Sequence, residues 1–160
     1  MIYLAYTRED ALFAVQIAED LAGMGIDIWL DINEIGAEAD WASAQQAAIV
    51  ASEGLIAVIS PEALNREHMH REVQQALADR KPVYLVVARR SPWRDWLTGL
   101  PIADFTQDYD QGLNDLVISL MSGGESSAER PRRAPDQARE EASPEDDEPS
   151  RSLLRRLLRR

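Results

Sequence analysis

The sequence predicts an α/β fold: a five-stranded, doubly wound parallel sheet with helices on both faces. Two nearly pure apolar and β-branched runs, at residues 55–59 and 82–87, are typical of strands that are covered on both faces. Helical patterns alternate with such runs along the first 120 or so residues, which indicates consecutive βαβ units. Right-handed crossovers then place helices on both sides of the sheet, as in flavodoxin-like folds.

Each expected element follows from a local pattern. Strands are expected at the apolar runs 2–6, 26–30, 55–59, 82–87 and 102–105. Helices are expected where apolar residues recur at helical spacing: from the N-cap Thr7 to Gly23, over 41–52, from Ser60 to Asp79 with a break near Asn65, and over 112–120. Because ligands of such sheets bind at the carboxyl ends of the strands, the site is expected at that edge.

The composition divides the chain into three parts. Residues 1–122 are expected to form the folded domain. Residues 123–150 are rich in Pro, Ser and charged residues without apolar periodicity, which predicts a disordered linker. Residues 151–160 place four Leu opposite four Arg on a short helix. This helix would contact a membrane surface or a partner, or it is an end fragment of a longer helix.

Charge and cysteine content exclude several classes of protein. The chain has a net charge of −11 and no Cys. All of the excess acid lies in residues 1–123, with 8 basic and 19 acidic residues, so nucleic-acid binding is not expected. Without Cys there are no disulfides, and a reducing, cytoplasmic location is natural. The sequence shows neither a signal peptide nor a transmembrane run.

Several functions that share this architecture lack their motifs here. A phosphoacceptor receiver needs an Asp at the end of its third strand, where this chain has Ser60. The dinucleotide fingerprint G-x-G-x-x-G and the hydrolase motif G-x-S-x-G are both absent. His68 and Glu72 share a helical face, but two ligands do not make a metal site, so no metal is expected.

The acidic stretch after the second strand is the most distinctive local feature. Residues 31–41 carry several carboxylates, no basic residue, and end on Trp41. A loop of this kind beside a buried strand suggests a binding site, although a solvated surface connection explains the same pattern.

Three runs together resemble a TIR (Toll/interleukin-1 receptor) domain of the bacterial type over roughly residues 1–121. The first is the run from Ile2 to Asp10, and the second runs from Ile28 through the acidic loop to Trp41. The third is Val-Ile-Ser-Pro at residues 58–61, followed by a helix with Glu72 and then by Lys-Pro-Val at residues 81–83. The resemblance implies a flavodoxin-like TIR fold.

The resemblance also implies two alternative activities in a signalling or defence role. Some family members cleave NAD⁺ at the nicotinamide–ribose bond, giving nicotinamide and ADP-ribose or a cyclic product. Others are non-catalytic adaptors that self-associate or bind other TIR domains. In the enzymatic members, one Glu on the third helix is catalytic, and Glu72 matches it; the alternative is an exposed helix residue. NAD⁺ would be a substrate, and no further cofactor is implied.

The remaining site residues are carried over by position from the same resemblance. Expected substrate-binding residues are Tyr6, Thr7, Arg8, Trp41 and His68, which stands where many active members have Trp. The resemblance places Asp31, Glu34, Ile35 and Gly36 in the BB loop, where they would serve assembly. Three alternatives stay open: Arg8 as a surface partner of neighbouring acids, Asp31 as a turn residue, and Trp41 as part of the core.

Overall fold

A computed structural model describes residues 1–30 and 41–123, and of residues 41 and 42 only the backbone. All of these belong to one compact unit, Met1–Arg130. The expected C-terminal linker and Leu/Arg helix, beyond residue 123, lie outside the described residues. The strands are β1 (Ile2–Ala5), β2 (Ile28–Trp29), β3 (Gly54–Ile59), β4 (Val83–Val87) and β5 (Ile102–Asp104). The helices are η1 (Arg8–Asp10), α1 (Ala11–Gly23), α3 (Trp41–Ala51), α4 (Pro61–Leu64), α5 (Glu67–Ala78), η2 (Asp95–Leu97) and α6 (Tyr109–Met121).

The five strands form one parallel sheet in the order β2-β1-β3-β4-β5. This confirms the predicted five-stranded, doubly wound parallel fold. Every residue of β3 is buried, as are the first four of β4, because both strands lie in the middle of the sheet and are covered on both faces.

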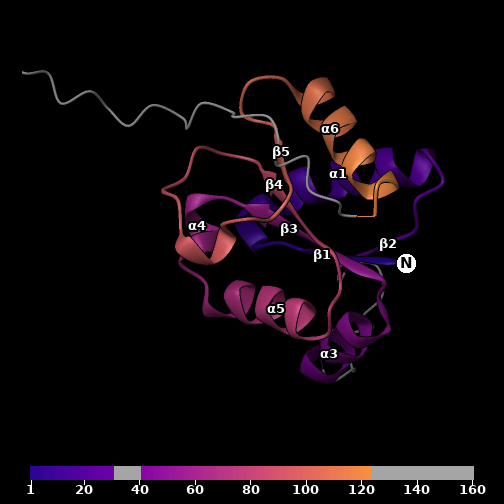
Figure 1. Cartoon of the computed structure of the whole chain (residues 1–160), viewed down its shortest axis with the longest axis vertical. Coiled ribbons are helices and arrows are strands. Elements are labelled where there is room, and N and C mark those ends of the chain that lie inside the picture. Colours follow the sequence, from indigo (N-terminus) through magenta and orange to yellow (C-terminus); the bar gives the residue numbers. More distant parts are fainter. Residues whose placement is uncertain (31–40, 124–160) are drawn as a thin grey trace, which may run out of the picture. The chain divides into compact units, whose positions relative to one another are not determined.

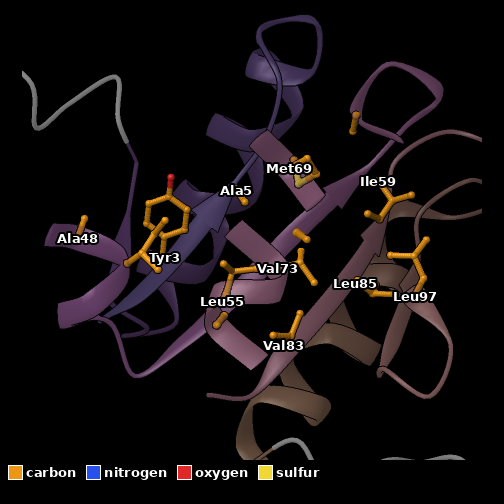
Figure 2. Packing of buried hydrophobic residues seen from close by; sticks show 14 residues of the cluster. Tyr3, Ala5, Ala48, Leu55, Ile59, Met69, Val73, Val83, Leu85 and Leu97 are labelled. Carbon is orange, nitrogen blue, oxygen red and sulfur yellow. The ribbon is translucent and has the colours of Figure 1, made fainter. Parts of the chain in front are cut away.

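Helices cover both faces of the sheet (Figure 1). The pair α3 and α5 lies on one face and the pair α1 and α6 on the other. Successive strand residues alternate between the two cores: Tyr3 and Ala5 of β1 enter the α3/α5 core, whereas Leu4 enters the α1/α6 core. Figure 2 shows the α3/α5 core, in which Tyr3, Leu55, Val73 and Leu85 meet between the sheet and the helices.

Local sequence signals explain where several helices begin and end. Ser60 caps α4 by accepting a hydrogen bond from the backbone N–H of Ala63 at 3.1 Å, with Pro61 in the first turn. Asn65 ends that helix, so the break predicted there is confirmed. At the carboxyl end of α3, Lys81 Nζ donates to the carbonyls of Ile49 and Val50 at 2.5 and 2.6 Å. Ser52 Oγ also donates to that of Ile49, at 2.7 Å, so both side chains help to satisfy the last turn of the helix.

Three expectations about individual elements were wrong. The second strand covers only Ile28–Trp29 rather than residues 26–30. On α3, the alanines at positions 44, 47, 48 and 51 were expected to face the sheet, but Ala48 and Ile49 are the buried residues among the α3 side chains that the structure describes. On α5, Leu77 was expected on the buried face with Met69, Val73 and Ala76, but it is exposed, whereas Glu72 is buried. None of the described helices is long and apolar enough to cross a membrane.

Candidate functional site

A buried carboxylate joins the carboxyl ends of three neighbouring strands. Asp10 is only 4% exposed and follows β1. Its Oδ2 accepts hydrogen bonds from Thr7 Oγ1 at 2.9 Å and from Ser60 Oγ, at the end of β3, at 2.5 Å. Its Oδ1 accepts from Arg89 Nη2, beyond the end of β4, at 2.9 Å. Asp10 therefore occupies the edge between β1 and β3, where the strand order reverses and doubly wound folds commonly bind ligands.

Arg89 is shared between this buried acid and an exposed one. Its guanidinium also contacts both carboxylate oxygens of Glu62, at 3.2 and 2.5 Å. The pKa of Arg89 is raised mainly by its hydrogen bond to Asp10 and also by that to Glu62. The pKa of Glu62 is lowered mainly by a hydrogen bond with its own backbone and also by Arg89. A second pair, Arg66 with Glu9 at 2.8 Å, lies on the surface of the same edge. This edge is thus held together by charge pairs within the chain.

The expected catalytic residue Glu72 is buried rather than exposed. It lies in the middle of α5 and is 6% exposed, which rules out the alternative of an exposed helix residue. Its Oε1 accepts a hydrogen bond from Gln45 Nε2 of α3 at 2.8 Å. Carboxylates are seldom buried unless they are bonded, so this position is built to hold one.

The partner of Glu72 is in turn fixed to the sheet. Gln45 Nε2 also donates to the phenol oxygen of Tyr3 at 2.9 Å. The Tyr3 ring is 2% exposed and stacks on Trp29 with centroids 5.1 Å apart and planes 18° from parallel. Glu72, Gln45 and Tyr3 therefore form a polar path from α5 through α3 to the inner strand β1.

The three residues expected to bind substrate after the first strand have different surroundings in the structure. Tyr6 packs against the α1/α6 core, on the other face of the sheet from the α3/α5 core to which α5 contributes. Thr7 is buried and its hydroxyl is used by Asp10. Arg8 is exposed, and within residues 1–30 and 41–123 it has no ion-pair partner. It therefore does not pair with Glu9 or Asp10, as the surface alternative supposed.

His68 lies one helical turn before Glu72 and is half-buried. Burial first, and then the positive charges of Arg66 and Arg71, lower the pKa of His68 below its usual value. The imidazole is therefore neutral near pH 7. Because α5 runs back from the carboxyl edge toward the start of β4, His68 is nearer that edge and Glu72 is one turn deeper.

Other expected site residues cannot be placed by side chain. The backbone of Trp41 begins α3, but its side chain lies outside the described part of the chain. The loop residues Asp31, Glu34, Ile35 and Gly36 also lie outside it. In the part that is described, no three His, Cys, Asp or Glu side chains gather as metal ligands.

Sequence reasoning missed three residues that shape this region. From the sequence, Tyr3 would be taken for one more apolar strand residue, and Gln45 would be placed on the exposed face of a surface helix. Asp10 reads as an acid that suits a helix dipole. The sequence did hold a signal for Asp10. It lies three residues after Thr7, just beyond the first strand, and Ser60 follows the end of the strand that pairs with it. Polar residues at the ends of neighbouring parallel strands are brought together by the topology.

These features define a small, doubly wound α/β domain with a buried, amide-bound glutamate on the helix that precedes its fourth strand. The sequence model of the TIR domain matches residues 2–117. Because this match covers most of the chain, the protein belongs to the TIR domain family.

Comparison of structures agrees with the family. The TIR domain of the Toll-related receptor TRR-2 from Hydra magnipapillata matches with a TM-score of 0.66 and 18% sequence identity. The match covers 76% of this chain and 95% of the receptor domain. At that identity the likeness shows the fold alone. None of the curated proteins compared with this chain matches it.

Proposed function

We propose that this TIR domain cleaves NAD⁺ at the nicotinamide–ribose bond, with Glu72 as the catalytic carboxylate. The observation that carries the proposal is the buried Glu72, held by the Gln45 amide at the helix position where the family resemblance places a catalytic glutamate. An ordinary surface glutamate on α5, such as Glu67, is exposed instead. The same position would serve NAD⁺ hydrolysis or formation of a cyclic product.

The chemistry needs only one carboxylate. The nicotinamide ring of NAD⁺ is cationic, so when the bond between ribose C1′ and the ring nitrogen breaks, the electron pair neutralises the leaving group. No general acid is required, unlike in ordinary glycosidases with their pair of carboxyl groups. Glu72 would stabilise the positive charge that develops on the ribose. In hydrolysis, water adds at C1′ and releases a proton, and the products are nicotinamide and ADP-ribose.

Two further residues suit the rest of the substrate by their chemistry. Arg8 is exposed at the carboxyl edge and could form charge-assisted hydrogen bonds to the pyrophosphate. His68 has a lowered pKa, so its ring is neutral at pH 7 and could stack on a cationic nicotinamide without charge repulsion. A reducing cytoplasm, which the lack of Cys favours, would supply the NAD⁺.

Nicotinamide release tests the proposal directly. The wild-type protein, Glu72→Gln and the control Glu67→Gln are incubated with NAD⁺ across a range of protein concentrations, and nicotinamide is measured by chromatography. We expect release by wild type and by the control, and a loss of at least about a hundredfold in Glu72→Gln. Equal release by wild type and Glu72→Gln would remove Glu72 from the role. No release at any concentration would refute the activity.

The second candidate function is a non-catalytic module that binds itself or other TIR domains. The observation that favours it is a set of large apolar side chains exposed on helix surfaces: Leu12 on α1, Val50 on α3, and Ile118 and Met121 on α6. Light scattering over a concentration series tests self-association. A protein that stays monomeric, alone and when mixed with other TIR domains, would count against it.

A further inference from the structure

We propose that Gln45 is a positioning residue that holds the Glu72 carboxylate in its reactive orientation. The proposal rests on the proposed NAD⁺ cleavage and adds a residue from a different helix, α3. It follows from the polar path between Glu72, Gln45 and Tyr3, in which the amide is the central member.

The amide nitrogen uses both of its hydrogens in this path. Gln45 Nε2 donates one to Glu72 Oε1 at 2.8 Å and the other to Tyr3 Oη at 2.9 Å. Both contacts are made by the amide nitrogen, so the NH₂ group of Gln45 faces Glu72 and Tyr3 together.

The far end of the path is rigid. Tyr3 lies in the inner strand β1, is 2% exposed, and is stacked on Trp29. A phenol held this way is a fixed acceptor, and an amide bonded to it has little rotational freedom. Gln45 thus links the Glu72 carboxylate on α5 to a fixed side chain of the sheet and favours one of its rotamers. Supporting contacts of this kind keep reactive groups in productive geometry.

The expected kinetic effect separates positioning from binding. Gln45 would contact the catalytic carboxylate rather than the substrate, so its loss should lower kcat and leave KM for NAD⁺ nearly unchanged. Removing one charge-assisted hydrogen bond should cost about a factor of ten in kcat. Loss of folding would instead lower the active fraction and the melting temperature together.

The test uses Gln45→Met, which keeps the length of the side chain and removes the donor. Its matched control is Gln46→Met, the same change at the next residue of α3, where the side chain is exposed. We expect kcat to fall about tenfold in Gln45→Met, with KM within about twofold, and wild-type values in the control. A wild-type kcat in Gln45→Met, alongside an inactive Glu72→Gln, would overturn the proposal while the proposed function stands.

A second measurement does not depend on activity. The side-chain NH₂ signals of Gln45 in ¹H–¹⁵N NMR spectra, assigned by their loss in Gln45→Met, should shift in Glu72→Ala, whereas those of Gln46 should not. If wild type releases no nicotinamide, the proposed function fails, and a shift of these signals still supports the holding contact. Signals of Gln45 that are the same with and without the Glu72 carboxylate would overturn it.

Discussion

Replacing Asp10 by Asn tests whether the buried carboxylate clamps the edge of the sheet. The change keeps the size of the side chain but removes the charge that Arg89 faces and one of the two accepting oxygens. Asp10 is 4% exposed and accepts from Thr7, Ser60 and Arg89. Breaking a buried ion pair by removing one partner costs about 3–5 kcal/mol. Here the Arg89 side chain is 47% exposed and keeps Glu62, so we expect about 2–3 kcal/mol.

For a domain of this size, that loss corresponds to a melting temperature lower by about 10 °C. Thermal and urea unfolding followed by circular dichroism measure it. The matched control is Glu62→Gln, which removes the exposed partner of the same guanidinium and should melt close to wild type because exposed ion pairs contribute little. If both variants melt alike, the reasoning is refuted, because burial of Asp10 would then add nothing to the strength of the pair.

The remaining predictions concern packing, capping and pH. Gly112→Ala should destabilise the domain by about 1–2 kcal/mol despite the better helix propensity of Ala, because the new Cβ would lie 2.7 Å from the Phe105 ring. The control Gly23→Ala, where a Cβ on α1 would meet nothing within 4 Å, should be neutral or stabilising in urea unfolding. Lys81→Met should cost about 1 kcal/mol, since the Val50 carbonyl loses the Lys81 donor and the Ile49 carbonyl keeps only Ser52; an unchanged melt would contradict this. The pKa of His68 should lie below 6.5 in an NMR titration, and a midpoint above 6.5 would contradict this. Because the pKa is lower in the folded than in the unfolded chain, the contribution of His68 to stability is complete above pH 6.5 and is lost as the pH falls.

The main-chain arrangement could be read from the sequence because it depends on local patterns. The apolar runs that became β3 and β4 are continuous, which only strands covered on both faces require. The apolar residues that recur at helical spacing in α1 are its buried residues: Ala14, Ile17, Ala18 and Leu21. Element ends were less predictable. The second strand is two residues long although the expected strand covered residues 26–30, because only Ile28 and Trp29 pair with β1.

The site was less predictable because side-chain partners depend on tertiary topology. The position of Glu72 came from a family resemblance, and its burial could not be read from a polar stretch of helix. The path through Gln45 joins residues 27 and 42 positions apart, and no local pattern relates them. Tyr6, which was expected to bind substrate, packs in the core opposite to that of α5, since alternate residues of a strand point to opposite faces.

The two outer strands limit how this domain can meet another protein. β2 has two residues and β5 has three, whereas the inner strands have four to six. A strand from another chain could gain only a few main-chain hydrogen bonds at such edges, and the outermost strand β5 also exposes Asp104. Short, charged edges are a common protection against edge-to-edge aggregation. Ordered assembly of this domain would therefore have to use side chains on its helices and connecting segments, and point mutations there would be able to tune it without disturbing the sheet.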